Sequence, residues 1–259
     1  MAVAPVHIER LSFSYPDGVI ALREVSLEVA AGETIGILGP NGAGKSSLLL
    51  QLNGLLRGEG GIRIGDLALN DRTLPRIRGL VGLLFQNPDD QLFMPTVYED
   101  VAFGPRNAGL SEPEVRRRVD EALAVVQVQS LAERPPHHLS IGQKKRVALA
   151  TVLAMDCSVL VLDEPTSGLD PRGRRELAQF LAGLEQTRII ATHDLEFAAE
   201  LCDRVAVLCE GEIVALGPPR EILSDAALMD RTGLEVPHSL RFHAAGIPHQ
   251  HLAARSPED

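Results

Sequence analysis

The sequence predicts an α/β fold with a parallel sheet at its core, an antiparallel β subdomain before it and a helical subdomain inserted into it. Short apolar runs alternate with helical segments in the second half of the chain, and this alternation is typical of parallel βαβ units. The apolar runs lie at 159–162, 189–191 and 205–208, and the helical segments at 172–184 and 195–201. The core is therefore expected to be α/β.

The first third of the chain supplies the second observation. Residues 6–14 and 21–29 alternate between apolar and polar side chains and are joined by Pro16-Asp17-Gly18, which predicts a β-hairpin. An apolar run at 34–38 predicts a buried strand, and a glycine-rich turn then leads into a helix expected over 44–53. We therefore expect a β subdomain followed by a strand, loop and helix unit.

The third observation is that the sequence pattern changes from strand-like to helical between residues 87 and 155. Prolines punctuate this stretch, and apolar residues recur at helical spacing from Val115 to Val126, so we expect a mostly helical insertion. The periodic signal fades beyond Leu223, and from Val236 no strand or heptad pattern remains, which predicts a tail. The expected organisation is a core with its β subdomain at 1–86 and 158–228, a helical subdomain at 87–157 and a C-terminal tail at 229–259.

The composition limits the class of protein. The 259 residues are 45% hydrophobic and 23% charged, which is typical of a globular protein with one main core. The formal net charge is −10, whereas proteins that bind nucleic acids usually carry a basic surface, so no nucleic acid partner is expected. The cysteines have no paired-ligand spacing and are expected to be buried thiols; they are Cys157, Cys202 and Cys209.

The chain shows no pattern for export or for crossing a membrane. The segment 1–11 has neither a basic start nor an apolar run, so we expect no secretory signal. The longest apolar stretch, 147–162, is interrupted by polar residues and is too short to span a bilayer. The protein is therefore expected to stay inside the cell, and other subunits would form any transport pathway.

The glycine-rich turn has the pattern of a phosphate-binding loop. It follows a predicted buried strand and opens a predicted helix, which is the context that this motif requires. Its backbone N–H groups would surround the phosphates of ATP, Lys45 would neutralise the β- and γ-phosphates, and Ser46 would ligate Mg²⁺. A plain glycine-rich turn before a helix is the structural alternative. The expected ATP-binding residues are Gly39, Pro40, Asn41, Gly42, Ala43, Gly44, Lys45, Ser46 and Ser47.

Two acids end the apolar run at 159–162. A buried strand that delivers carboxylates to its C-terminal edge fits a P-loop NTPase (RecA-like) core, since ligands bind at that edge of a parallel sheet. Asp163 would hold Mg²⁺ through water, and Glu164 would polarise the water that attacks the γ-phosphate. Acids after a strand are more often a loop or a helix cap, but the phosphate loop upstream favours the catalytic interpretation.

Leu139-Ser140-Ile141-Gly142-Gln143 resembles the LSGGQ signature of ATP-binding-cassette proteins, and it lies a short distance before the strand that carries the two acids. The resemblance covers about residues 5 to 225. It also includes Tyr15, Gln86, Ser167-Gly168-Leu169-Asp170 and His193.

The resemblance implies roles for these residues. Tyr15 would stack on adenine, since an aromatic face suits a purine. Gln86 would ligate Mg²⁺ and sense the partner subunit, His193 would contact the γ-phosphate with a catalytic role beside Glu164 and Lys45, and Asp170 would contribute to the ATP site. Taken alone, each of these residues is more often a packing or solvated side chain, and only the ordered set favours function.

The resemblance also implies a dimer. Ser140, Gly142 and Gln143 would bind the ATP held by the phosphate loop of the other protomer, in a homodimer or in a heterodimer with a paralogue. This sequence departs from the signature at Ile141, where the family most often has glycine. A β-branched residue there would be strained if the position needs a positive φ, but we expect function to survive.

Two stretches point to one branch of the family. Residues 85–93 and 96–105 look like the ATPases of energy-coupling-factor importers, and residues 140–148 and 152–155 are similar to the ATPase of cobalt and nickel importers. The resemblance implies a transmembrane coupling subunit, a membrane substrate-binding subunit and a peripheral position on the cytoplasmic face of the membrane. A vitamin importer, a non-transport ATPase of DNA repair or translation and a phosphate-loop kinase are the alternatives; the non-transport class lacks support because the chain has no heptad insertion.

Two further hypotheses concern surfaces. The segment 87–100 is expected to form a docking groove for the membrane subunit, because acids surround an apolar centre; the acids are Asp89, Asp90, Glu99 and Asp100, and the apolar residues Leu92, Phe93, Met94 and Val97. The tail histidines suggest a metal site, but their spacing matches no ligand pattern and a solvated tail is preferred; they are His238, His243, His249 and His251.

Overall fold

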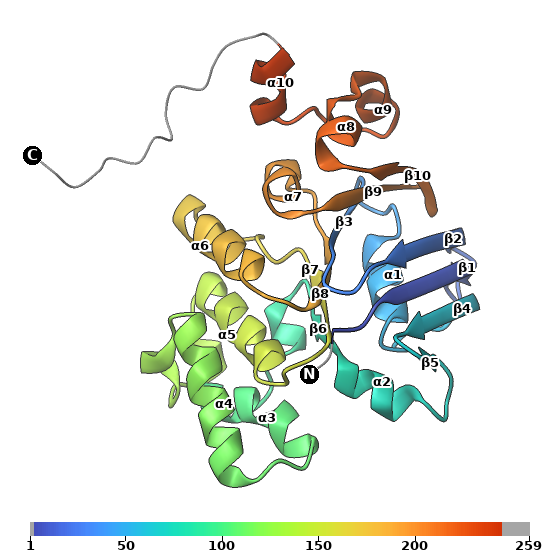
Figure 1. Cartoon of the computed structure of the whole chain (residues 1–259). Coiled ribbons are helices and arrows are strands. Elements are labelled where there is room, and N and C mark those ends of the chain that lie inside the picture. Colours follow the sequence, from blue (N-terminus) through green and yellow to red (C-terminus); the bar gives the residue numbers. More distant parts are fainter. Residues whose placement is uncertain (1–2, 245–259) are drawn as a thin grey trace, which may run out of the picture.

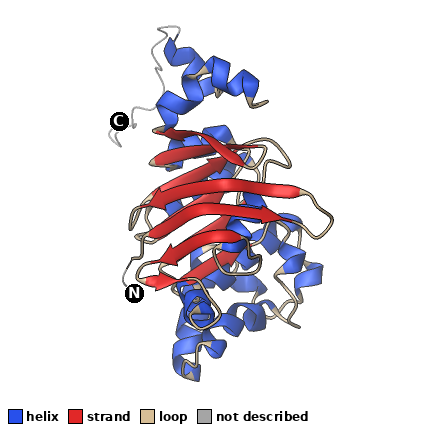
Figure 2. Ribbon diagram, turned by 90° about the vertical axis from the view of Figure 1, so that its right-hand side faces the viewer, coloured by secondary structure: helices blue, strands red, loops and turns tan. Residues whose placement is uncertain are grey.

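The computed structural model describes residues 3–244 of the chain. Two sheets and a cluster of helices make up this part (Figure 1). The larger sheet has the strand order β10-β9-β3-β8-β7-β6, and the smaller one has the order β2-β1-β4-β5. Figure 2, turned by 90°, shows the strands in the middle of the molecule, with helices gathered at its two ends.

The larger sheet is parallel except at its β10 edge, as the sequence predicts. Strands β3, β7 and β8 are buried at every position, which explains the apolar runs in them; β8 also buries Thr187 and Arg188. Helix α1 (Lys45–Gln51) packs against β7 and β8. The strands are β3 (Thr34–Leu38), β6 (Val81–Leu84), β7 (Val159–Asp163), β8 (Thr187–Ala191), β9 (Arg204–Cys209) and β10 (Glu212–Gly217).

The smaller sheet confirms the predicted hairpin and extends it. Strand β1 (Val6–Ser14) pairs antiparallel with β2 (Ile20–Val29) on one side and with β4 (Glu59–Ile64) on the other. Short β5 (Leu67–Ala68) completes the edge, and α2 (Leu74–Leu80) leads back to the larger sheet. The inward side chains of this sheet share one apolar core with those of β3, β7 and β8.

The insertion between β6 and β7 is helical, as expected. Its three α-helices share a core around Val115, Val119 and Val147, which are fully buried. They form the green cluster beside the sheet in Figure 1. The elements are η1 (Pro88–Asp90), α3 (Val97–Asn107), α4 (Glu112–Val125), η2 (Gln129–Leu131), η3 (Pro136–His138) and α5 (Ile141–Leu153).

The C-terminal part is more ordered than the predicted tail. After α6 (Pro171–Ala182), α7 (Leu195–Leu201) and α8 (Pro219–Ser224), the chain forms α9 (Ala226–Arg231) and α10 (His238–Ala244). Leu228 and Met229 are buried against β9 and α7, and Ser239 donates to Glu196 at 3.1 Å through its N–H. Helices of six or seven residues hold too few turns for a periodic signal, which explains why the prediction of a tail from residue 229 was wrong.

Two sequence-based expectations lie at the limit of the described residues. The expected tail at 245–259, with His249 and His251, lies outside them, as does the side chain of His243. Within residues 3–244, no helix combines the length and the apolar character needed to cross a membrane.

Candidate nucleotide site

The glycine-rich turn after β3 forms a narrow loop around a lysine ammonium. Lys45 Nζ donates to the carbonyl oxygens of Gly39 at 2.8 Å and of Pro40 at 3.0 Å. Gly39 has φ 152°, and a Cβ there would lie 2.1 Å from the carbonyl oxygen of Leu208, so only glycine fits. Burial lowers the pKa of Lys45, while the nearby Glu164 and Asp163 oppose that change.

The end of β7 brings Asp163 to this loop. Burial raises the pKa of Asp163 above its usual range, while a hydrogen bond from Ser46 opposes the rise. Its Oδ1 atom is buried and has no hydrogen-bond partner among residues 3–244. A carboxylate oxygen with a free lone pair beside a serine hydroxyl is a donor set that Mg²⁺ prefers, so these two residues fit a magnesium site.

Glu164 follows Asp163 with an unusual backbone. Its φ is 48°, in the left-handed region that costs energy for a residue other than glycine. Its N–H donates to the carbonyl of Ala191 at 2.8 Å. Its side chain is 5% exposed. Oε2 accepts from Thr192 Oγ1 at 3.2 Å and lies 2.8 Å from His193 Nδ1. The carboxylate is therefore held between the ends of two neighbouring parallel strands.

A cavity of about 530 Å³ connects these groups. Many of the residues that the sequence singled out line it. Tyr15 lies on its wall, where its hydroxyl is 2.9 Å from Ser47 Oγ and its ring contacts Phe13 edge-on at 5.0 Å between centroids. The predicted residues on the wall are Tyr15, Asn41, Gly42, Gly44, Lys45, Ser46, Ser47, Gln86, Asp163 and Glu164.

The signature residues lie elsewhere in the chain, at the start of α5. Ser140 caps this helix: its Oγ accepts from the N–H of Gln143 at 3.3 Å, and Gln143 Oε1 accepts from the N–H of Ser140 at 3.0 Å. Among the described residues that line the cavity, none is Ser140, Gly142 or Gln143. The capped N-terminus of α5 therefore contributes nothing to the wall of this chain's own cavity.

Ile141 is the first residue of α5 and has no positive φ. The condition for strain at this departure from the signature is therefore not met. Asp170 lies apart from the cavity wall as well, and its carboxylate caps α6 by accepting from the N–H of Gly173 at 2.6 Å.

The segment 87–100 differs in part from the predicted groove. Asp100 is 3% exposed and accepts from the N–H groups of Phe93 and Met94 at 3.0 Å each, so it supports a turn and does not form a charged rim. The predicted apolar centre is also wrong at Leu92 and Val97, which are buried in the helical core. Asp89, Asp90 and Phe93 are exposed, and the ring of Phe93 lies edge-on to that of the exposed Phe103 on α3, with centroids 5.0 Å apart.

Two residues near the site were not found from the sequence. Thr192 follows β8 directly and contacts the carboxylate of Glu164. Lys145 is 6% exposed, and its Nζ donates to the main-chain oxygen of Glu164 at 2.8 Å. The only sequence signal for Lys145 is its place on the apolar face of α5, four residues before the buried Leu149.

A strand, glycine-rich loop and helix with a buried lysine, facing two acids at the end of the neighbouring strand, define a P-loop nucleoside triphosphatase. The model of the ABC transporter family matches residues 22–167, which is more than half of the chain. Given this match, the chain belongs to the ABC transporter family, and it is an ATPase whose hydrolysis of ATP is coupled to transport.

Individual proteins agree with this assignment. The energy-coupling factor transporter ATP-binding protein EcfA of Carboxydothermus hydrogenoformans is 50% identical over 236 residues, 90% of this chain and 87% of that protein. The structure of cbiO1 from Clostridium perfringens, described as part of the ABC transporter complex cbiONQ, is 39% identical with a TM-score of 0.76, covering 92% and 98%. A dimeric ATP-binding cassette, MJ0796 bound to ADP and Pi, is 30% identical with a TM-score of 0.76, covering 83% and 98%.

Proposed function

We propose that this chain is the ATP-hydrolysing subunit of an energy-coupling-factor importer for cobalt or nickel ions. The observation that carries the ATPase part is the position of the Glu164 carboxylate, which adjoins both His193 and the cavity wall that Lys45 and Asp163 share. The importer branch is supported by relatives named for energy-coupling factors and by likeness to cbiO1. The choice of a metal ion over a vitamin rests on cbiO1 and on the residues after the signature.

The residues of the cavity would divide the work of phosphoryl transfer. Lys45 and the loop N–H groups would hold the β- and γ-phosphates, and Tyr15 would stack on the adenine. Ser46, Asp163 and Gln86 would hold Mg²⁺, which supplies charge neutralisation on the phosphates when bound. Glu164 would orient the attacking water, and His193 would hold the carboxylate and the γ-phosphate in line.

The separation of the α5 cap from this chain's own cavity supports a dimer. The N-terminus of a helix suits a phosphate, so the serine cap of α5 and its neighbours would complete the site of a second protomer; these residues are Ser140, Gly142 and Gln143. Lys45, Glu164, His193 and Ser140 all lie in one chain, so a homodimer would have two complete sites; a heterodimer with a paralogue is the alternative. ATP would close this dimer and its hydrolysis would reopen it.

The exposed pair of Phe93 and Phe103 supports a docking place for the transmembrane coupling subunit. Aromatic side chains are enriched at the centres of interfaces; Phe93 belongs to the segment 87–100 that follows Gln86, and Phe103 lies on the adjoining helix α3. The chain would thus lie on the cytoplasmic face of the membrane, held by the coupling subunit and, through it, by the substrate-binding subunit.

Co-expression with the membrane subunits tests the proposal. We expect the wild-type chain to co-purify with them and to support ATP-dependent uptake of Co²⁺ or Ni²⁺. Replacing Phe93 and Phe103 by serine should abolish co-purification while leaving ATP affinity unchanged. Val214→Ser, a substitution at an exposed residue of β10, serves as the matched control. Normal assembly of the double variant would contradict this docking place, and uptake of a vitamin without uptake of metal would contradict the substrate class.

A further inference from the structure

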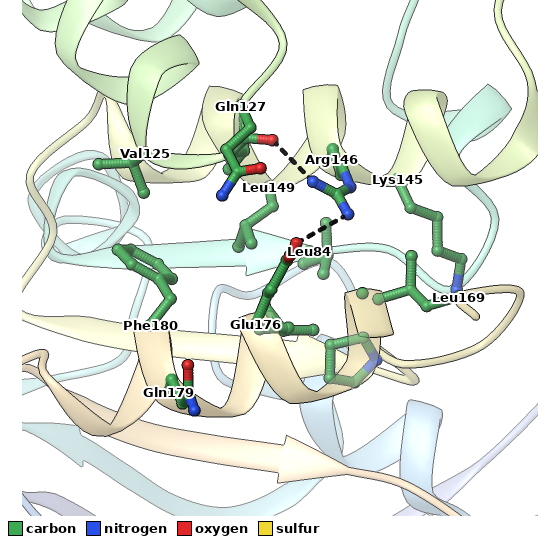
Figure 3. Close-up of a pocket in the computed structure, with 14 residues that line it drawn as sticks. Leu84, Val125, Gln127, Lys145, Arg146, Leu149, Leu169, Glu176, Gln179 and Phe180 are labelled. Carbon is green, nitrogen blue, oxygen red and sulfur yellow. Dashed lines mark hydrogen bonds and ion pairs between the residues drawn. The ribbon is translucent and has the colours of Figure 1, made fainter. Parts of the chain in front are cut away.

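A buried ammonium crosses from the signature helix to the backbone of Glu164. Lys145 lies on α5, five residues after the cap Ser140, and its side chain leaves the helix beside Arg146. In Figure 3 these two side chains diverge, Arg146 toward Glu176 and Lys145 past Leu169. Lys145 Nζ ends 2.8 Å from the carbonyl oxygen of Glu164, which belongs to the parallel-sheet core.

The contact is unusual because burying a charge is costly without strong partners. Lys145 is 6% exposed, and in the described part of the chain its ammonium makes this one hydrogen bond. Burial lowers the pKa of Lys145, and the charges of Glu164 and Asp163 oppose that change. Packing alone would be served better by methionine or leucine, so the charged end needs another explanation.

That explanation lies in the backbone of Glu164. Its φ of 48° is unfavourable for a residue with a side chain, and such a conformation persists only where surrounding contacts hold it. The N–H of Glu164 donates to the carbonyl oxygen of Ala191 at 2.8 Å. The carbonyl oxygen of Glu164 accepts from Lys145 Nζ and, in a longer bond of 3.2 Å, from the N–H of Ser167. With the peptide held on both sides, the carboxylate points to Thr192 and His193.

We propose that Lys145 is a positioning residue for ATP hydrolysis, which holds the peptide of Glu164 in its left-handed conformation and ties it to the position of the signature helix. A shift of α5 moves Lys145 Nζ relative to the carbonyl oxygen, so the carboxylate of Glu164 responds to the place of Ser140 in the same chain. This inference rests on the proposed role of Glu164.

Lys145→Met tests the role of the hydrogen bond from Lys145 to Glu164, because methionine keeps the apolar stem and removes the donor. We expect kcat for ATP to fall roughly 10-fold or more, since small misplacement of a reacting group has effects of this size. The KM for ATP should stay within about 2-fold, and the melting temperature should hardly fall, because methionine keeps the apolar stem buried and removes a buried charge. Lys144→Met is the matched control, because its ammonium pairs with Asp89 at 2.6 Å and makes no contact with Glu164 among the interactions of the described residues.

A cavity beside Lys145 permits a second, sharper test. It measures about 350 Å³ and is lined by Lys145, Arg146, Leu149, Leu169 and Phe180, among others (Figure 3). Lys145→Ala removes four side-chain atoms, and propylammonium supplies the same three carbons and one nitrogen. We expect added propylammonium to restore part of the lost kcat of Lys145→Ala, and not that of Lys145→Met, whose side chain fills the space. Tetramethylammonium, which has the charge without an N–H donor, should restore nothing.

The outcomes distinguish a wrong role for Lys145 from a wrong role for Glu164. Wild-type kcat in Lys145→Met, or a loss of kcat matched by a loss of melting temperature or by the Lys144→Met control, would overturn the positioning role. Failure of propylammonium to restore Lys145→Ala would overturn it as well. If Glu164→Gln keeps wild-type turnover, the proposed role of Glu164 fails first; if Glu164→Gln is slow while Lys145→Met is normal, only this inference fails.

Discussion

The proposed chemistry at the end of β7 depends on single side chains. Glu164 is the residue on which the proposed mechanism depends most, because its carboxylate is buried, adjoins His193 and belongs to a strained backbone. Such a group acts by orienting water, and glutamine preserves its shape while losing its charge.

Glu164→Gln should therefore bind ATP normally and hydrolyse it roughly 10²–10⁴ times more slowly, the usual contribution of a positioned acid or base. Steady-state phosphate release measures the rate, and calorimetry measures the affinity. Glu185→Gln, on an exposed residue, is the control. A variant at Glu164 with wild-type turnover would exclude this residue as the group that positions water.

Tyr15 has two contacts that different substitutions separate. Tyr15→Ala removes the ring and should weaken ATP binding by about 1–3 kcal/mol if the ring stacks on adenine. Tyr15→Phe removes the hydroxyl that lies 2.9 Å from Ser47 Oγ and should bind ATP almost as the wild type does. Calorimetric titration with ATP distinguishes these cases. A fall in melting temperature of Tyr15→Ala with unchanged affinity would mean that the ring serves only to pack against Phe13.

At the scale of secondary-structure elements, α5 connects the two halves of the proposed mechanism. Its first turn carries the capping box of Ser140 and Gln143, and its second turn carries Lys145. The helix begins at Ile141 without a positive φ, so the departure from the family's glycine is compatible with this geometry.

Ile141→Gly, which restores the family pattern, should not raise ATP turnover. It should lower the free energy of unfolding by less than about 1 kcal/mol, because glycine is a poorer helix residue and the isoleucine is already half exposed. Urea unfolding and steady-state ATPase measure the two quantities. An increase in turnover would show that the β-branched residue restrains the signature, against the conformation seen here.

At the scale of the whole molecule, the proposed dimer makes each site depend on two chains. Lys45→Ala would damage the phosphate loop, and Ser140→Arg would damage the signature cap that is proposed to serve the partner. Neither homodimer would hold an intact site. A mixed dimer would combine the intact loop of one chain with the intact cap of the other.

Mixing the two inactive variants should therefore restore ATPase activity, to at most about half of the wild-type value per chain, because one of the two composite sites is complete. Titration of one variant against a fixed amount of the other measures this gain. Two preparations of Lys45→Ala mixed together are the control and should stay inactive. Absence of any gain would contradict a site shared between protomers.

Much of the fold and of the candidate nucleotide site can be predicted from local sequence. The strands β3, β7 and β8 are buried at every position, so their apolar runs identify them directly. The residues from Gly39 to Ser46 are contiguous, and a loop that closes around phosphates depends mainly on its own backbone and on the strand before it. Asp163 ends β7 and Glu164 follows it directly, so their place at the sheet edge could be predicted as well.

Other features depend on contacts between segments that are distant in sequence, and only the tertiary structure decided them. Asp100 reads as a surface acid but is buried beneath the turn at Phe93, and Met229 reads as part of a tail but packs in the core. Lys145 reads as one of two neighbouring lysines, yet one pairs with Asp89 and the other reaches Glu164. Local sequence determines which backbone conformations and apolar patterns are favourable, whereas the fate of a charged side chain depends on the partners that folding brings to it.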